Sequence, residues 1–146
     1  GVINPEIDAG HPVILTSAVR DEGTSYHYIP PSREVEPRGK VTRALIDTFT
    51  EAGLDFRVGK AWTTDALYRE TKGKRKARLE EGCEVVEMEA AALFAVAQFR
   101  EVSIGQVVYG GDLVVPEGWD SRSWAKRGDD RRLLFDLSVK AARKLF

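Results

Sequence analysis

Apolar positions along the chain follow two periods, one typical of strands and one typical of helices. Short apolar runs rich in β-branched residues predict strands, and apolar residues three and four positions apart predict helices. By these patterns the strands lie at 13–19, within 55–64 and 102–111, and at 85–87, and the helices lie at 39–52, 88–100 and near the C-terminus. Strands that alternate with helices indicate an α/β layered fold.

Weaker patterns predict the segments between these elements. The alternation in TSYHYIP indicates an edge-like strand before Pro30, and Gly53 is placed to end a helix in a left-handed cap. Asp65 is a candidate cap for a short turn that holds Leu67 and Tyr68. The charged RETKGKRKARLEEG reads as a solvated loop leading into a helix, and DLVVPEGWDSRSW as irregular. One face of the last helix carries Leu133, Leu134, Leu137, Ala141 and Leu145.

Composition narrows the class of protein. With 146 residues, 42% of them hydrophobic, the chain is expected to form one globular domain over residues 1–146. The net charge of −1 and interspersed signs predict neither nucleic acid nor a membrane surface as partner, and no apolar run approaches a membrane span. A single cysteine excludes an internal disulfide and a cysteine zinc cluster, which fits a reducing cytoplasm.

Two acids, Glu87 and Glu89, interrupt an otherwise apolar strand–helix junction around Met88, the only methionine of the chain. Burying an unpaired carboxylate is costly, so these groups are expected to have partners, either protein donors or the hydroxyls of a ligand. The alternative is structural: Glu89 would favour the helix dipole, and Met88 would fill the core.

A second polar junction follows the strand predicted within 102–111, where Gly110 and Gly111 precede Asp112. In open α/β sheets the carboxyl ends of strands converge on the ligand, so Asp112 is expected near the acidic junction. The alternative is a turn aspartate or a helix cap. Trp119 and Trp124 are predicted either to cover the core or to form a lid near Asp112.

Several segments then resemble one family. VVEMEAAALFAVA is similar to the segment of nucleoside phosphorylases in which a Glu-Met-Glu element contacts the sugar of the nucleoside. GVINPEIDAGHPVILTSAVRDEGTSYHY resembles the region after the family's phosphate loop, VGKAWTTDALYRE the segment lining the base pocket, and VVYGGDLV the strand end of purine-handling members. The resemblance covers roughly residues 1–115.

The resemblance implies an α-β-α fold of the nucleoside phosphorylase type that lacks the N-terminal part of its central sheet. It further implies that Glu89 accepts hydrogen bonds from ribose hydroxyls, with Met88 packed on the sugar and Glu87 in the same wall. Asp112 would protonate a purine at N7, beside Gly111. The base-stacking positions hold Leu67, where the family often has phenylalanine, and Tyr68.

The reaction implied is the phosphate-dependent cleavage of a nucleoside to free base and ribose 1-phosphate, with inorganic phosphate as co-substrate and no cofactor. A purine is favoured because RETKGKRK does not reproduce the Gly-Gln-Glu-Arg-Tyr pattern of uridine-cleaving members. The alternatives are a nucleosidase that uses water, a uridine phosphorylase, and a non-catalytic nucleoside-binding domain.

In this family the protein groups that bind phosphate lie mainly in the N-terminal half, ahead of the region that the segment starting at Gly1 resembles. We therefore expect the isolated chain to be a C-terminal portion with weak or no activity and an open sheet edge. Association with the N-terminal half, or homo-oligomerisation, is the partnership that the resemblance implies.

Overall fold

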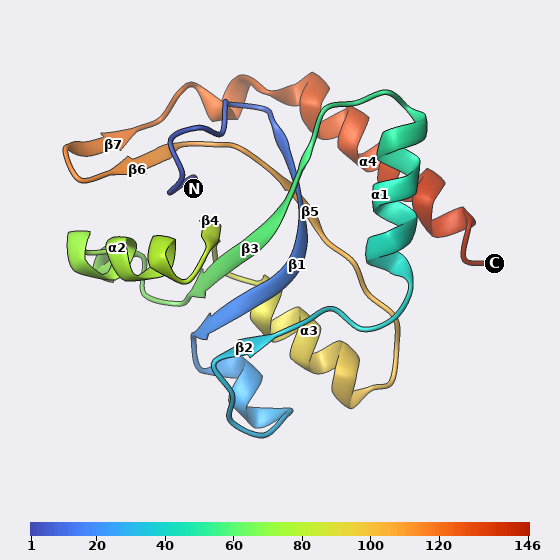
Figure 1. Cartoon of the computed structure of the whole chain (residues 1–146), viewed down its shortest axis with the longest axis horizontal. Helices are drawn as coiled ribbons and strands as arrows, with labels where there is room; N and C mark the ends of the chain where they lie inside the picture. Colours follow the sequence, from blue (N-terminus) through green and yellow to red (C-terminus); the bar gives the residue numbers. More distant parts are fainter.

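Three parallel strands form the middle of the computed structural model, which describes residues 1–146. β1 (Pro12–Asp21) pairs with β3 (Arg57–Thr64), and β3 pairs with β4 (Cys83–Glu87). The other edge of β1 is shared by two short antiparallel strands, β2 (Glu34–Val35) near its carboxyl end and β5 (Val107–Tyr109) near its amino end. The carboxyl ends of β1, β3 and β4 therefore lie at one edge of the sheet (Figure 1).

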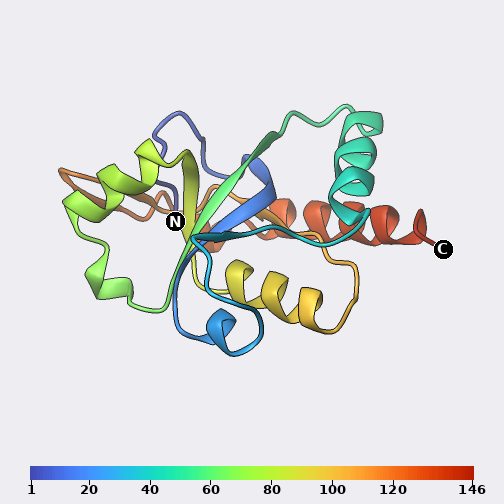
Figure 2. The ribbon, with the colours of Figure 1, turned by 60° about the horizontal axis from the view of Figure 1, so that its bottom comes forward.

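Helices cover both faces of this sheet. α1 (Val41–Glu51) and α4 (Gly128–Arg143) pack against each other, and α3 (Ala90–Phe99) lies elsewhere, beside β1 and β2 (Figures 1 and 2). The fourth helix, α2 (Lys72–Glu80), precedes β4. Three short 3-10 helices complete the list: η1 (Thr24–His27), η2 (Leu67–Arg69) and η3 (Trp124–Lys126).

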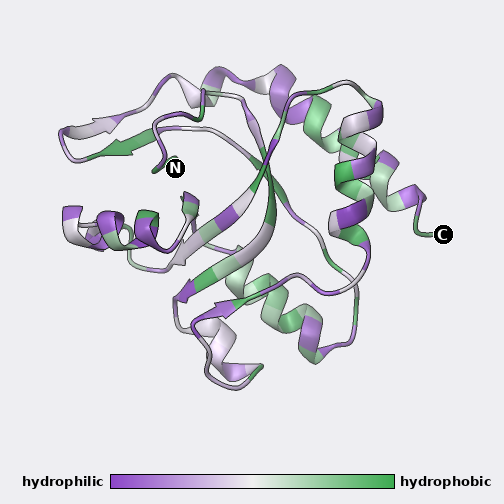
Figure 3. Ribbon diagram, viewed as in Figure 1, coloured by the Kyte–Doolittle hydropathy of each residue, from purple (hydrophilic) through white to green (hydrophobic).

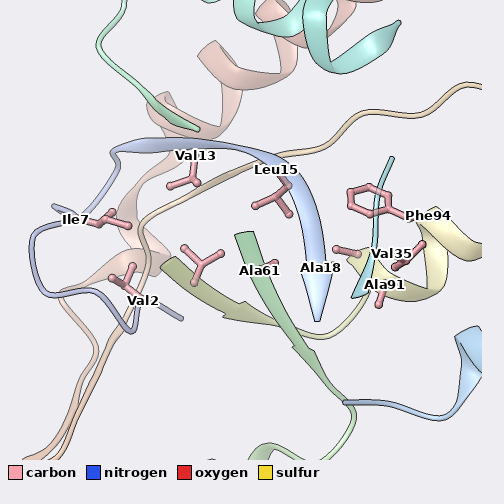
Figure 4. Packing of buried hydrophobic residues seen from close by; sticks show 11 residues of the cluster. Val2, Ile7, Val13, Leu15, Ala18, Val35, Ala61, Ala91 and Phe94 are labelled. Atoms are coloured by element: carbon pink, nitrogen blue, oxygen red, sulfur yellow. The ribbon is translucent and has the colours of Figure 1, made fainter. Parts of the chain in front are cut away.

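The core divides along β1 because neighbouring residues of a strand face opposite sides. Ile14 packs into the cluster of α1 and α4, whereas Leu15 packs into the cluster of α3. The cluster that contains Leu15 and α3 runs the length of β1, from Val2 and Ile7 to Phe94 (Figure 4). Figure 3 shows α3 as mostly hydrophobic and α2 as mostly hydrophilic, which agrees with their buried and peripheral places. The α/β layered fold predicted from the sequence is confirmed.

The elements with strong periodicity lie where the sequence predicted them. β1, α1, β3 and α3 match the predicted segments within a few residues, and Gly53 has the left-handed φ of 64° expected of a helix cap. On α4 the predicted face is buried at Leu134, Leu137 and Ala141, but Leu133 is 45% exposed.

Five local predictions differ from the structure. TSYHYIP contains the 3-10 helix η1, since Glu22 accepts from the Ser25 amide and buried Arg20 donates to the Ser25 hydroxyl and to the Pro30 carbonyl. Asp65 does not cap η2; its carboxylate accepts from the Gly23 amide instead.

The other three concern segments of mixed polarity. The strand predicted within 102–111 is reduced to β5, and DLVVPEGWDSRSW contains a regular hairpin of β6 (Leu113–Val115) and β7 (Gly118–Asp120). RETKGKRKARLEEG is largely helical, and its Arg75 is buried because the guanidinium donates to the carbonyls of Ile3 and Val114.

The outer edge of β4, expected to be open, is partly paired. Val2 forms an antiparallel bridge with Val85 and a parallel bridge with Leu113, so the first residues lie between β4 and the β6–β7 hairpin. Figure 1 shows the N-terminus between this hairpin and α2. None of the helices combines the length and the apolar composition that a membrane span requires.

Candidate functional site

Asp112 stands at the point where the chain leaves β5 and enters the hairpin. The turn requires glycine at 110, because a Cβ there would clash with the carbonyl oxygen of Asp8. Gly111 has no such neighbour; it is buried, and a Cβ would meet only Trp124 at van der Waals distance, 3.7 Å away. Of the two glycines, only Gly110 is therefore closely approached by another backbone segment.

Three contacts hold the Gly111–Asp112 pair in place. The Val2 amide donates to the Asp112 carbonyl at 2.8 Å, and Arg122 Nε donates to the Gly111 carbonyl at 2.9 Å. The Trp119 indole Nε1 donates to Asp112 Oδ2 at 2.7 Å. With a side chain that is 24% exposed, Asp112 is anchored yet open to a ligand.

A cleft of about 550 Å³ opens beside Asp112, within the size range of small-molecule sites. Its apolar walls come from η2 and from the hairpin region, and two carboxylates, Asp112 and Glu70, face into it. Burial raises the pKa of Glu70; the amino group of Gly1 opposes the rise, and the Asp112 charge adds to it. The complete lining is Leu67, Tyr68, Glu70, Asp112, Val114, Trp119 and Trp124.

The first acid of the junction, Glu87, turns inward and holds the start of α3. Its Oε2 accepts from the amides of Glu89, at 2.8 Å, and Ala90, at 2.7 Å. Its Oε1 accepts from the hydroxyl of Thr63, which in turn accepts from the Ala91 amide at 3.0 Å. Glu87 therefore has the protein donors that a buried carboxylate needs, and its oxygens in turn satisfy the free amides at the start of α3.

Met88 and Glu89 face outward. Met88 is 46% exposed, and the exposed Glu89 carboxylate forms no hydrogen bond or ion pair with the rest of the chain. Neither residue lines the 550 Å³ cleft. Met88 is thus not core filler, and of the two acids only Glu87 has protein donors as partners.

The acidic junction and Asp112 are close neighbours. The Gly1 amino group donates to the Val86 carbonyl at 2.8 Å, and its nitrogen lies 3.5 Å from Asp112 Oδ1. Because Val86 directly precedes Glu87, one backbone group separates the end of β4 from Asp112. The residues predicted from the sequence divide into three that line the cleft (Leu67, Tyr68, Asp112), an exposed pair called the rim (Met88, Glu89) and a supporting pair (Glu87, Gly111).

Comparison with known proteins identifies the arrangement. A family model described as the phosphorylase superfamily matches residues 1–132. The chain belongs to the phosphorylase superfamily.

Relatives of this superfamily match at moderate identity. Over 119 residues the chain is 32% identical to the uridine phosphorylase of Treponema pallidum. This match covers 74% of this chain and 46% of the relative. Over 115 residues it is 26% identical to the guanosine phosphorylase of Halorubrum lacusprofundi, covering 78% of this chain and 48% of the relative. The chain thus spans about half the length of these relatives.

The fold of this phosphorylase-superfamily chain is also found in a solved structure. The P. knowlesi homologue of P. falciparum PNP superposes with a TM-score of 0.80 at 19% identity, covering 99% of this chain and 58% of that one. The nucleoside phosphorylase fold predicted from the resemblance is confirmed.

Sequence reasoning missed three residues of this site. Glu70 sits in a charged stretch that looks solvated, Arg122 in a stretch that looks irregular, and Thr63 in an apolar strand. Only Thr63 left a signal, because a hydroxyl at the carboxyl end of a buried strand needs a partner. Glu70 and Arg122 reach the site through η2 and through the hairpin, which no periodicity predicted.

The supporting role of Glu87 predicts a pH dependence of stability. Burial raises the pKa of Glu87 above its ordinary 4.5, although bonds from Thr63 and from the amides of Glu89 and Ala90 oppose the rise. A carboxyl whose pKa is higher in the folded state binds its proton more tightly there, so it destabilises the fold as pH rises through that pKa. We expect Glu87→Gln to reduce this decline in the melting temperature on going from acid to neutral pH.

Thermal unfolding across this range measures the effect. Glu117→Gln, which changes an exposed acid on the hairpin turn, is the control and should keep the wild-type profile. A Glu87→Gln profile parallel to wild type would contradict the prediction.

Proposed function

We propose that this chain binds a purine nucleoside and takes part in the phosphate-dependent cleavage of its N-glycosidic bond, which yields free base and ribose 1-phosphate. The observation that carries the proposal is the place of Asp112. Its anchored carboxylate faces a cleft with Tyr68, Trp119 and Trp124 in its walls, and the Gly1 nitrogen lies between this carboxylate and the carbonyl of Val86, the residue before Glu87.

The cleft suits the base. Aromatic side chains offer flat apolar surface for stacking, and Asp112 offers a proton to a ring nitrogen at the edge of a purine. As the glycosidic bond breaks, the departing base gains an electron pair, so protonation by Asp112 at N7 stabilises it. Leu67 and Tyr68 contribute to one wall, as the resemblance implies.

The rim suits the sugar. Glu89 has two carboxylate oxygens without protein donors, which ribose hydroxyls can supply, and Met88 presents an exposed apolar side chain for the ring. The transition state carries positive charge on the sugar, and a nearby carboxylate favours that charge. Glu87 orients this rim because it binds the Glu89 amide.

The phosphate site is proposed from the resemblance alone. Inorganic phosphate would be the co-substrate, and in the family the groups that bind it lie mainly in the N-terminal half. We therefore propose that the 146-residue chain alone is weakly active or inactive, and that association with the N-terminal half or with further copies completes the site.

Uridine is the second candidate substrate, because the Treponema pallidum relative at 32% identity is a uridine phosphorylase. Against uridine stands RETKGKRK, which lacks the glutamine and arginine that read a pyrimidine edge in the pattern typical of uridine-cleaving members. Inosine, guanosine and uridine therefore form the panel that decides the base.

Binding of this panel to the chain tests the proposal. Inosine and guanosine should bind more tightly than uridine, and Glu89→Ala should weaken inosine binding about ten- to a hundredfold, since bonds to a charged group contribute about 1.5–3 kcal/mol. The free energy of unfolding of the same variant should lie within about 0.5 kcal/mol of the wild-type value, because Glu89 is exposed and unpaired.

Titration calorimetry measures the affinities, and Glu117→Ala, an exposed acid on the hairpin turn, is the matched control. Equal inosine affinity in wild type and Glu89→Ala would refute the sugar site. Tighter binding of uridine would reassign the base, and base release without phosphate would make the enzyme a nucleosidase. Binding without release in any form of the protein would favour a non-catalytic domain.

A further inference from the structure

We propose that Trp119 is a positioning residue that decides which oxygen of Asp112 carries the proton for the departing base. The proposal rests on the proposed function, and it adds a residue whose role is to aim the acid. It is carried by one contact, the hydrogen bond of 2.7 Å from Trp119 Nε1 to Asp112 Oδ2.

The chemistry of indole makes this contact directional. An indole N–H only donates, so the oxygen that faces it must accept. A protonated Asp112 therefore keeps Oδ2 as its carbonyl oxygen and carries the proton on Oδ1. Oδ1 receives no hydrogen bond from any side chain of the protein, and the Gly1 nitrogen lies 3.5 Å away. Trp119 thus leaves Oδ1 as the oxygen that can donate to a ligand.

The β6–β7 hairpin brings the Trp119 indole back to Asp112, the residue just before the hairpin. In the β6–β7 register Trp119 lies opposite Val114, two residues after Asp112. Beyond β7 the chain turns through Arg122 and Ser123, which have left-handed φ values of 44° and 53° that non-glycine residues rarely adopt. Arg122 then donates to the carbonyls of Gly111 and Ile7, at 2.9 and 2.8 Å.

The same side chain also reaches the ligand. Trp119 is 65% exposed and lines the cleft, so its indole nitrogen holds the acid while its ring face remains available to the base. The charged groups around Asp112 are the Gly1 amino group and the Glu70 carboxylate, with the Arg122 guanidinium on the neighbouring Gly111 carbonyl.

The proposed step transfers one proton to the base and breaks the glycosidic bond. The O–H bond at Asp112 Oδ1 breaks and its proton moves to N7 of the purine, while the bond between C1′ and N9 breaks and leaves its electron pair on the base. A phosphate oxygen forms the new bond to C1′. Asp112 becomes a carboxylate, and the Trp119 hydrogen bond strengthens because bonds to an ionised acceptor are stronger than neutral ones. Trp119 therefore favours the state in which the proton has left.

Ligand discrimination by the 146-residue chain tests the role. Inosine and 7-deazainosine differ at N7, where the analogue has a C–H that cannot accept the proton. At mildly acid pH, wild type should bind inosine about tenfold more tightly than 7-deazainosine. Trp119→Phe should reduce this affinity ratio below about threefold, the loss expected for one hydrogen bond. Trp124→Phe, in the same cleft but without a bond to Asp112, should keep the ratio.

Nuclear magnetic resonance checks the contact without a ligand. The chain has three tryptophans, so the two phenylalanine variants assign the indole N–H signals. Asp112→Asn should shift the Trp119 signal and leave that of Trp62 in place, because the Trp62 indole donates to Asp21. An unshifted Trp119 signal, or equal ratios in the two phenylalanine variants, would overturn the proposal. A shifted signal in a chain that binds no nucleoside would refute the proposed function and leave the pairing intact.

Discussion

Asp112→Asn should lower kcat/KM for base release from inosine by about a hundredfold to ten-thousandfold, the range typical of a lost general acid. Asparagine is close in size and can accept the Trp119 hydrogen bond through its amide oxygen. Its NH₂ group can donate to N7 but cannot give up a proton. The backbone anchors from Val2 and Arg122 do not involve the carboxylate, so the turn should keep its shape.

Steady-state release of hypoxanthine, with saturating phosphate and in whichever form of the protein turns over inosine, measures this loss. KM should change far less than kcat, because the variant keeps the stacking walls and the hydrogen bond to N7. Glu117→Gln removes one negative charge from the same hairpin and should keep wild-type activity, since Glu117 is exposed. A kcat/KM within about threefold of wild type would rule out Asp112 as the acid.

The largest loss of stability is expected from Phe94→Ala, at about 3–5 kcal/mol. Phe94 is fully buried on α3 and belongs to the cluster that runs along β1, where Leu15, Val35 and Ala18 surround the same region (Figure 4). Removing the ring leaves a cavity between α3 and the sheet. The loss is a large share of the 5–15 kcal/mol that holds a typical domain folded.

Urea unfolding followed by tryptophan fluorescence measures the loss. Leu93→Ala is the matched control on the same helix, because Leu93 is 46% exposed and its truncation should cost at most about 1 kcal/mol. Equal free energies of unfolding for the two variants would show that α3 does not anchor the core through Phe94. Since α3 also begins at the Glu87 network, Phe94→Ala should weaken inosine binding as well.

The structure also separates two acids that the sequence presents as a pair. Glu87 and Glu89 are both polar interruptions of an apolar run, and the sequence offers each of them protein donors or a ligand. Glu87 turns inward because Thr63 on β3 and the first amides of α3 are there to meet it, whereas Glu89 has no donor within the chain. The side chain without protein donors is the one left for a ligand.

The sequence by itself determined the features that depend on local periodicity and on short motifs. The apolar runs placed β1, β3 and β4, the helical spacing placed α1 and α3, and the motifs around Met88 and Asp112 indicated the family that the comparison then showed. Such signals are readable because strand and helix periods are properties of a few consecutive residues.

Only the tertiary structure decided how the site is assembled. Trp119 on Asp112, Arg122 on Gly111 and Ile7, and Val2 between β4 and β6 are contacts between segments whose pairing no local pattern encodes. The same holds for η1, where Arg20 and Glu22 turn a strand-like alternation into a 3-10 helix. A buried polar group takes whichever partner the packed fold brings within hydrogen-bonding distance, and that choice is made in three dimensions.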